Sequence, residues 1–449
     1  MKRKIYDDIL NWKETYNGKA ALLIEGARRV GKSYIAEVFA KENYKSYILI
    51  DFNKASDVVK ECFDLYLDDL DTFYMYLTSY FKTSLYERES VIIFDEVQLY
   101  PRARSAIKYL VADGRYDFIE TGSLMGIKEN VQNILIPSEE HRIEMNPLDF
   151  EEFLWALGNN TLMELIKTCF KEHKSLGNLH KTAMDYFKKY LIVGGMPQVV
   201  QTFIDSNYDF AKVDIIKRDI LELYRSDMHK RSLSCGLKAE GIFDEIPDQL
   251  QRHDKKFRIT ALDEDAKTRD YEDAFLWLKD AKIANIAFNT TEPSVGLKLN
   301  RDTSTYKLYM LDTGLLLAHA FDTRTIIAED IYQKILFDKL EFNKGMIIEN
   351  VVAQMLAASG NKLFFYSNYS REASDRMKID FLVTSTKISS KHNICSIEVK
   401  SGKNYTINSL NKFKNKYKSF LHTPYVIHTG DYKEENGIVY LPIYMTPLL

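Results

Sequence analysis

The stretch that decides the fold is ALLIEGARRVGKSY, residues 21–34. An apolar run opens it, a loop with two glycines follows, and the chain then continues as a helix. Residues 26–33 of the loop match G-x-x-x-x-G-K-S/T, a pattern in which backbone N–H groups turn towards a phosphate. Because a strand precedes the loop and a helix follows it, the stretch predicts a phosphate-binding loop and not a ligand-free glycine-rich turn.

The chemistry of this loop indicates ATP and Mg²⁺ as cofactors. Lys32 would reach the β- and γ-phosphates, and the Ser33 hydroxyl would bind Mg²⁺. The N-terminus of the following helix adds a favourable field for anions. We expect the nucleotide to be bound by Gly26, Ala27, Arg28, Arg29, Val30, Gly31, Lys32, Ser33 and Tyr34.

Further apolar runs end in polar residues. They are SYILIDFN (46–53), SVIIFDE (90–96) and YDFIETGS (116–123). Short apolar strands that alternate with helices predict an α/β fold with a parallel sheet, whose ligands bind at the carboxyl ends of the strands. Asp95 is therefore predicted to hold Mg²⁺, and Glu96 to polarise the attacking water.

The end of the third run offers a contact to the γ-phosphate. Either Thr121 or Ser123 could reach it, and Ser123 is favoured because Gly122 lets the chain turn there. A simple turn residue is an equally good interpretation.

A second candidate site lies near the C-terminus. In SIEVKSG (396–402), Glu398 and Lys400 point to one face of a predicted strand. Asp380 begins another strand, and Glu349 lies on a predicted amphipathic helix, GMIIENVVAQML (345–356). This order matches the PD-(D/E)xK nuclease pattern.

The roles in that pattern follow from phosphodiester chemistry. Asp380 and Glu398 are predicted to hold Mg²⁺, Glu349 to support a second metal ion or a water, and Lys400 to position the nucleophile. The alternative is a fold that keeps these residues for binding or structure without cleavage.

The middle of the chain is predicted to be helical from NPLDFEEFLWAL (146–157) to Tyr224, with a break at VGGMPQ (193–198). Two or three helices and a two-stranded wing around TEPSVG (291–296) then suggest a winged-helix-like module. Its last helix would either contact DNA or pack against another domain. The predicted domains are a P-loop ATPase core (1–145), a helical lid (146–228), the winged-helix-like module (229–320) and a restriction-endonuclease-like domain (321–449).

The motifs GARRVGKS, VIIFDEVQ, TGSL, HRIEMNPLDFEEFL and VGGMPQVV, in this order, resemble the AAA-type prokaryotic (archaeal-ATPase/STAND-like) ATPases. Many of these carry a C-terminal restriction-endonuclease-like domain of uncharacterised function. The resemblance covers essentially the whole chain and implies the four domains given above. It does not imply a particular substrate.

The resemblance also implies two further site residues. Gly195 and Pro197 match a G-x-P motif that lies beside the nucleotide base in related clades, although Gly and Pro can also simply break a helix. Arg142 would sense the γ-phosphate, from its own chain or from a neighbouring subunit of a homo-oligomer. A surface arginine is the alternative.

Composition limits the function classes. The chain has 449 residues and a net charge of −3, so general attraction to DNA or anionic lipid is not expected. No apolar run approaches the roughly 20 residues of a membrane helix, and the four separated cysteines indicate reduced thiols in the cytoplasm. Two hypotheses stay open: ATP hydrolysis coupled to handling of DNA or RNA, or an ATP-controlled switch with slow turnover and an inactive C-terminal domain.

Overall fold

The computed structural model describes the chain except for residues 124–137, 231–232, 295, 322–331, 333, 335–343, 371, 373–374, 385–392 and 403. The described residues form two compact units. Unit 1 contains Met1–Asn146 and Asp280–Lys282, and unit 2 contains Pro147–Lys279 and Ile283–Leu449. Each unit is described by itself below. No helix in the described part of the chain is long and apolar enough to cross a membrane.

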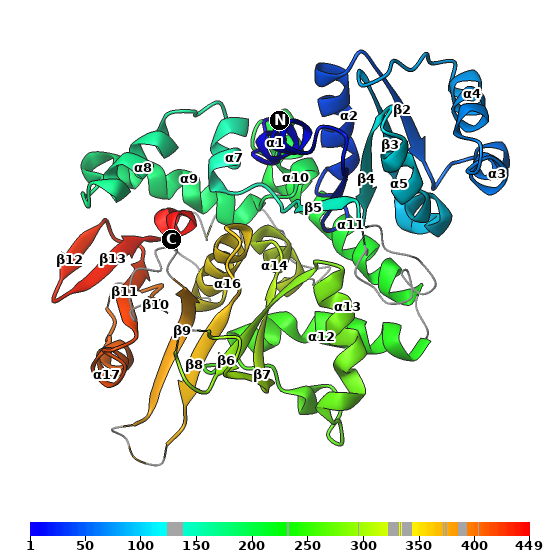
Figure 1. The fold of residues 1–449 in the computed structure, drawn as a ribbon. Helices are drawn as coiled ribbons and strands as arrows, with labels where there is room; N and C mark the ends of the chain where they lie inside the picture. The colour runs from blue at the N-terminus through cyan, green and yellow to red at the C-terminus, as the bar shows by residue number, and fades with distance from the viewer. Residues whose placement is uncertain are drawn as a thin grey trace. The chain divides into compact units, whose positions relative to one another are not determined.

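Unit 1 is built on a parallel five-stranded sheet with the order β2-β3-β4-β1-β5 (Figure 1). The central strands SVIIFD (90–95) and DFIETG (117–122) are buried along their whole length. In the first of them, four consecutive apolar residues occupy both faces of the sheet. The parallel sheet predicted from the sequence is thereby confirmed. Its strands are β1 (Ala21–Glu25), β2 (Ser46–Asp51), β3 (Ser90–Asp95), β4 (Asp117–Gly122) and β5 (Glu140–Glu144).

Helices pack against this sheet. The helices of unit 1 are α1 (Ile5–Tyr16), α2 (Lys32–Asn43), α3 (Asp57–Leu65), α4 (Leu70–Phe81) and α5 (Pro101–Asp113). One hydrophobic core joins alternate strand residues, such as Ile92 and Phe94, to apolar side chains of α3, α4 and α5, such as Phe63. The phosphate-binding loop lies between β1 and α2, so both elements that flank it are fixed by this packing.

Unit 2 begins with helices and continues into a mixed sheet. Its helices are α7 (Phe150–Ala156), α8 (Leu162–Lys171), α9 (His180–Val193), α10 (Pro197–Asp205), α11 (Phe210–His229), α12 (Leu233–Gln251), α13 (Glu272–Asp280, whose last residue belongs to unit 1), α14 (Thr313–Ala320), α16 (Lys344–Ala358) and α17 (Asn408–Lys416). Helix α7 starts with a capping box, in which the Asp149 side chain accepts from Glu152 N–H and the Glu152 side chain accepts from Asp149 N–H.

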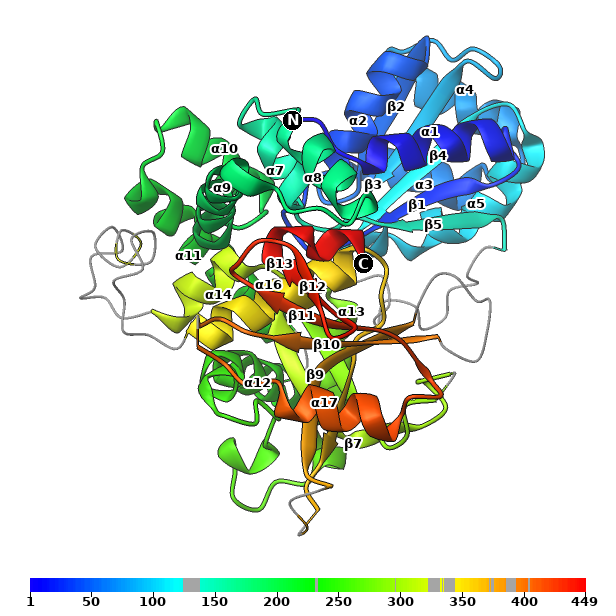
Figure 2. The same ribbon diagram turned by 90° about the vertical axis from the view of Figure 1, so that its left-hand side faces the viewer.

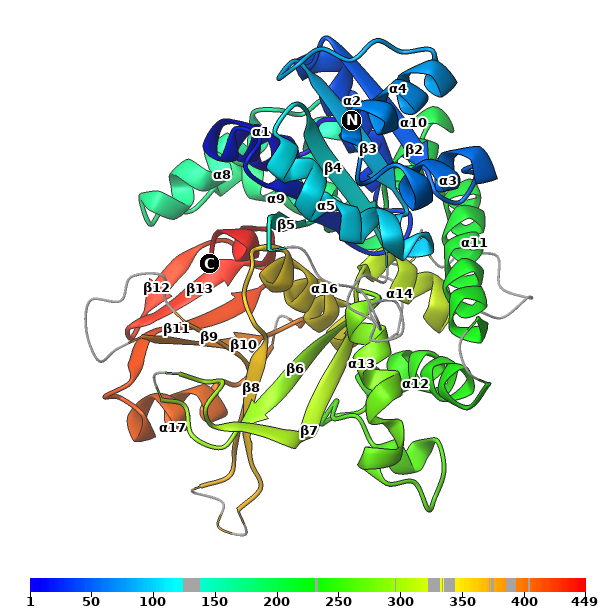
Figure 3. The same ribbon diagram turned by 45° about the vertical axis from the view of Figure 1, so that its right-hand side comes forward.

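The sheet of unit 2 has eight strands in the order β12-β13-β11-β10-β9-β8-β6-β7. Figure 3 shows β6 and β7 beside β8. The strands are β6 (Ala284–Thr290), β7 (Arg301–Met310), β8 (Phe364–Asn368), β9 (Met377–Thr384), β10 (Ile394–Val399), β11 (Leu421–His428), β12 (Lys433–Glu435) and β13 (Ile438–Pro442). The hairpin predicted as a two-stranded wing is part of the same sheet as the E-x-K strand, because β6 pairs with β7 and, in parallel, with β8. The winged-helix-like module itself stays a prediction.

Two helices frame the later strands (Figure 2). Helix α16 packs against β6, β7 and β10, and α17 packs against β9 and β11. The prediction that α16 is amphipathic was wrong, because every residue from Met346 to Leu356 is buried. Its polar side chains are satisfied inside the unit: Asn350, for example, accepts from Met310 N–H at 2.8 Å.

Candidate functional site

The phosphate-binding loop requires its glycines. A Cβ on Gly26 would lie 2.3 Å from the Met145 carbonyl oxygen, so no larger residue fits there. Gly31 caps α2 with φ 98°, and Arg29 adopts φ 70°, a conformation that is rare outside glycine. The loop is also held by Arg3, a buried residue whose guanidinium donates to Val30 O at 3.1 Å and to Asn146 O at 2.6 Å.

Lys32 lies inside this loop. Its Nζ donates to the carbonyl oxygens of Gly26 and Ala27, each at 3.0 Å. Burial lowers the pKa of Lys32 to about 8, although Glu96 and Asp95 act in the opposite direction. The ammonium is thus held by two uncharged backbone carbonyl groups of the loop.

Ser33 and Asp95 meet across the loop. Ser33 Oγ donates to Asp95 Oδ1 at 2.7 Å, and the Thr121 hydroxyl donates to the same oxygen. Burial raises the pKa of Asp95, while these two hydroxyls lower it. The serine and aspartate predicted to hold Mg²⁺ are therefore in direct contact, at the carboxyl end of β3.

Glu96 follows Asp95 with φ 53°, in the left-handed region that glutamate rarely adopts. Its Oε2 accepts from Gln98 Nε2 and, at 3.2 Å, from Ser123 Oγ. Strained backbone of this kind recurs at functional sites. Of the two hydroxyls considered from the sequence, Thr121 contacts Asp95 and Ser123 contacts Glu96.

Arg142 lies on β5, which is an edge strand of the sheet. Its Nε donates to Glu140 Oε1 at 2.6 Å, and its Nη1 lies 3.8 Å from Glu25 Oε1. The side chain is 44% exposed. In this arrangement the guanidinium is paired with carboxylates of its own unit.

Gly195 and Pro197 belong to unit 2, where their contacts have a structural explanation. Gly195 N–H donates to the buried Asp312 carboxylate at 2.6 Å, and a Cβ on Gly195 would lie 2.1 Å from Leu148 O. Gly194 adopts φ 80° against the same Asp312 side chain. Pro197 occupies the first turn of α10, where its missing N–H costs nothing. These contacts fit a helix break, and a contact of the motif with the nucleotide base stays a prediction.

Unit 2, called the C-terminal unit below, brings together Asp380, Glu398 and Lys400. Asp380 Oδ2 accepts from Val399 N–H at 3.0 Å, and Lys400 Nζ donates to Glu398 Oε1 at 2.7 Å. The other carboxylate oxygen of Glu398 is buried and has no hydrogen-bond partner among the described residues. Burial and the charge of Asp380 raise the pKa of Glu398 to about 7, against the opposing effect of Lys400.

Glu349 is buried and fully engaged. Its Oε1 accepts from Lys307 Nζ at 2.8 Å and from the Tyr309 hydroxyl at 2.6 Å, and its Oε2 accepts from Lys255 Nζ. Although burial alone would raise the pKa of Glu349, Lys255, Lys307 and Lys378 hold it well below its usual value. The carboxylate predicted to support a second metal ion or a water is thus bound to ammonium groups.

Lys307 and Lys378 connect this cluster to Asp380. Their Nζ atoms lie 3.9 Å and 3.6 Å from Asp380 Oδ1. Sequence analysis missed both lysines, as well as Lys255 and Tyr309. The available signals were the K-x-D spacing in β9 and a single lysine within the apolar run TYKLYM of β7. Within the described residues, no group of three or more His, Cys, Asp or Glu is placed to hold a metal ion.

Comparison with known families identifies the domain that contains the first of the two sites. Residues 18–154, which contain the loop and the ends of β3 and β4, match the model of an AAA domain. This part of the chain is an AAA-type P-loop ATPase domain. Two further matches carry no function: a domain of unknown function, DUF8612, at residues 184–325, and a domain of unknown function, DUF4143, at residues 344–446.

The chain also resembles several solved structures. The Walker-type ATPase PABY2304 of Pyrococcus abyssi is 15% identical over 71% of this chain and 95% of that chain, with a TM-score of 0.41. The Aeropyrum pernix ORC1 protein, solved in complex with DNA, is 9% identical over 72% and 93%, with a TM-score of 0.30. The STAND protein PH0952 of Pyrococcus horikoshii is 11% identical over 80% and 49%, with a TM-score of 0.29. With every TM-score below 0.5, these similarities add nothing to the assignment of the ATPase domain. No curated protein matches significantly.

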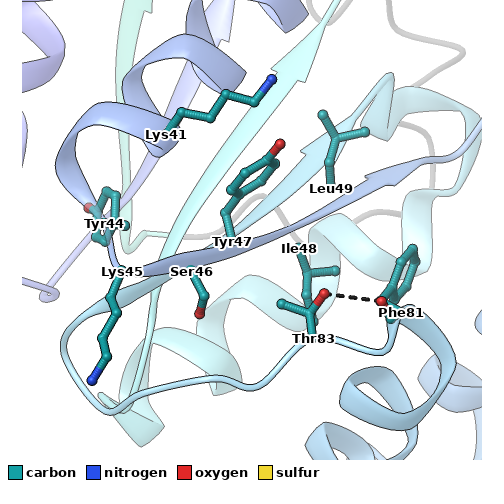
Figure 4. Close-up of a pocket in the computed structure, with 9 residues that line it drawn as sticks. All are labelled: Lys41, Tyr44, Lys45, Ser46, Tyr47, Ile48, Leu49, Phe81 and Thr83. Carbon is teal, nitrogen blue, oxygen red and sulfur yellow. Dashed lines mark hydrogen bonds between the residues drawn. The ribbon is translucent and has the colours of Figure 1, made fainter.

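A separate pocket of about 480 Å³ lies on the ATPase domain at the start of β2 (Figure 4). It is lined by side chains from β2 and from the C-terminal end of α2, including Lys41, Lys45 and Tyr47. The phosphate-binding loop precedes the other end of α2, about 16 Å away for a helix of this length. This pocket is therefore not the nucleotide site.

Proposed function

We propose that the protein is a Mg²⁺-dependent ATPase whose C-terminal unit binds nucleic acid at a nuclease-like site. The observation that carries the first part is the 2.7 Å hydrogen bond between Ser33 and Asp95. A hydroxyl from the phosphate-binding loop and a carboxylate at a neighbouring strand end are the pair that holds Mg²⁺ against the β- and γ-phosphates. Mg²⁺ would neutralise the charge that develops on those phosphates.

The remaining residues of the ATPase domain take roles that fit their positions. Lys32 exchanges its two carbonyl acceptors for phosphate oxygens, and Glu96 orients the attacking water. Ser123 holds the Glu96 carboxylate in place. A γ-phosphate contact from Arg142 would require that this side chain leave Glu140, and it stays a prediction.

ATP turnover tests this proposal. We expect Lys32→Ala to abolish ATP binding, whereas Glu96→Gln should bind ATP and hydrolyse it about 10²- to 10⁴-fold more slowly, the usual effect of losing a general base. Lys41→Ala is the matched control, because Lys41 lies on the same helix, is exposed and forms its salt bridge with Glu37. Unchanged turnover in a folded Lys32→Ala protein would contradict the proposal.

A second function, metal-dependent cleavage of DNA or RNA, is favoured by one observation. Glu398, beside Asp380, presents a buried carboxylate oxygen that has no hydrogen-bond partner in the part of the chain that the structure describes. A lone buried acceptor is costly unless a cation or donor satisfies it, and two carboxylates with a nearby lysine suit one divalent cation. Asp380 and Glu398 would hold that cation, which would supply Lewis-acid stabilisation of a phosphodiester, and Lys400 would position the nucleophile.

The site fits one metal ion better than two. Glu349, the ligand expected for a second ion, is already bound by two lysines and a tyrosine. The ammonium of Lys307 lies between Glu349 and Asp380, where it offsets the repulsion of the two carboxylates. The chain's own lysine would thus take the place of a second metal ion.

Calorimetric titration with Mn²⁺ tests the metal site, and cleavage assays on DNA and RNA test the activity. Asp380→Asn and Glu398→Gln should remove both, whereas Asp375→Asn should remove neither, because Asp375 is an exposed acid that pairs with Lys416. Metal binding without cleavage would favour a binding module under control of the ATPase. The absence of both would contradict the nuclease interpretation.

A further inference from the structure

Glu349, Lys307, Lys378 and Asp380 form a cluster of charged side chains, which we call the nuclease-like cluster. Residues 253–258, which follow α12, contact this cluster at two points. Lys255 Nζ donates to Glu349 and, at 3.1 Å, to Gly345 O on α16. Lys378 Nζ donates to His253 O at 3.2 Å. Lys255 adopts φ 50°, a conformation that costs free energy for a lysine and is maintained only where surrounding contacts enforce it. This left-handed residue directly precedes Lys256, which is one member of the pair described next.

Lys256, which is half-buried, and the exposed Tyr369 form a pair beside this cluster. The Lys256 ammonium lies 4.1 Å from the centroid of the Tyr369 ring, and Tyr369 is 59% exposed. No carboxylate among the described residues forms an ion pair with Lys256. Burial lowers the pKa of Lys256, and the charges of Lys307 and Lys378 lower it further against the attraction of Asp254.

Charges of both signs surround Lys256. Lys307 and Lys378 repel its ammonium, and Asp254 and Asp302 attract it. Lys307 is buried and pairs with Glu349, whereas the Lys256 ammonium forms no salt bridge among the described residues. It can therefore pair with a phosphate group of a nucleic acid.

The exposed ring adds a second kind of recognition. An aromatic side chain next to a lysine provides a surface on which an unpaired base can stack, while the ammonium binds the adjacent phosphate. In a duplex the bases are already stacked on one another, so a single tyrosine ring cannot reach a base face without separating the strands. The combination favours a single strand as the ligand.

We propose that Lys256 and Tyr369 form a subsite for single-stranded nucleic acid at the edge of the nuclease-like site. Tyr369 stacks on one base, and Lys256 binds a neighbouring phosphate. The inference rests on the proposed function of the C-terminal unit, since it names the ligand class of that site. It depends on neither metal binding nor cleavage.

Fluorescence anisotropy with the full chain tests the subsite. The probes are a labelled oligonucleotide of about 20 thymidines and a duplex of the same length, titrated in an Asp380→Asn background that prevents cleavage. We expect the single strand to bind more tightly. Tyr369→Ala should weaken its binding about 5- to 100-fold, the range found when one base-stacking ring is removed. Lys256→Gln should reduce the dependence of log Kd on log salt by about one, and Lys256→Arg should preserve it.

The chain offers a matched control pair in the same unit. Lys189 lies 5.6 Å from the ring of Tyr208, which is also exposed, and neither residue contacts the cluster. Lys189→Gln and Tyr208→Ala should leave binding unchanged. Thermal melting of each variant confirms that it folds, and Tyr369→Ala tests the proposal even if Lys256→Gln does not fold.

Two results would overturn the subsite: equal affinity for single strand and duplex, or equal effects of Tyr369→Ala and Tyr208→Ala. The second result would not affect the metal site, which the Mn²⁺ titration measures separately. Conversely, single-strand binding that depends on Tyr369 and persists without any Mn²⁺ binding would support the subsite and contradict only the nuclease proposal.

Discussion

Replacing Glu349 with glutamine tests whether this carboxylate stabilises the fold or is a metal ligand. The Glu349 side chain is 3% exposed and accepts hydrogen bonds from Lys255, Lys307 and Tyr309. Glutamine keeps the shape and one acceptor but removes the charge. Among the carboxylates of the described residues, the fully buried ammonium of Lys307 would then lie near Asp380 alone, at 3.9 Å.

The expected cost follows from that burial. Removing one partner of a buried ion pair typically destabilises a protein by about 3–5 kcal/mol, because it leaves an uncompensated charge. Glutamine retains a hydrogen bond to Lys307, so we expect about 3 kcal/mol, the lower end of this range. For a unit of this size that corresponds to a decrease in Tm of roughly 6 °C. A metal ligand behaves in the opposite way, because neutralising one of several crowded carboxylates stabilises the metal-free protein.

Tryptophan fluorescence can report on unit 2 alone. Of the three tryptophans, Trp12 lies in unit 1, so a Trp12→Phe background leaves only Trp155 and Trp277, both in unit 2. Urea unfolding of Glu349→Gln, Lys307→Met and the double variant then gives a double-mutant cycle. We expect a coupling energy of about 1.5 kcal/mol or more. A stabilised Glu349→Gln protein, or a coupling energy near zero, would refute the reasoning and restore Glu349 as a metal ligand.

Further predictions address the ATPase domain, the glycine pair of unit 2 and its metal site. Thr121→Val should slow ATP hydrolysis about tenfold or more, since it removes a hydrogen bond to the Asp95 carboxylate, whereas Thr121→Ser should keep it. Gly195→Ala should destabilise unit 2 by about 2 kcal/mol or more in urea unfolding, because its Cβ would overlap Leu148 O. Gly241→Ala, in the interior of α12 with Leu262 at 3.7 Å, should instead be neutral or stabilising by about 0.5–1 kcal/mol. Calorimetry should find about one Mn²⁺ per chain in the absence of nucleotide, and a second ion bound through Glu349 would contradict the role given to Lys307.

The local parts of both sites could be predicted from the sequence. A strand, a loop and a helix follow one another up to and beyond Lys32. Spacing and periodicity were therefore sufficient to predict that Lys32 lies at the end of the loop. Asp95 was found for the same reason, because a strand that ends in an acid is a local pattern. The E-x-K pair depends only on the alternation of side chains along β10, and Lys400 and Glu398 do form an ion pair.

The non-local parts could not be predicted. Lys307 and Lys255 reach Glu349 from 42 and 94 residues away in the chain, and nothing in their own neighbourhood marks them as partners of a carboxylate. The left-handed backbone of Glu96 is fixed by tertiary contacts and not by its own preference. Helix α16 was misjudged because Glu349, Asn350 and Gln354 suggested an exposed face, whereas each side chain meets its partner inside the unit.

The continuous sheet of unit 2 limits how this protein could be divided or recombined. Strands β6 and β7 lie in the stretch that matches DUF8612, and β8 to β13 lie in the stretch that matches DUF4143. The two stretches are joined by the pairing of Phe288 with Phe364 and by the lysines that hold Glu349. If the two regions were expressed separately, each fragment would have an unpaired strand edge and buried charges without their partners. We therefore expect recombination between related proteins to exchange the two regions only together. The sequence boundary between the two family matches is not a boundary between two folding units.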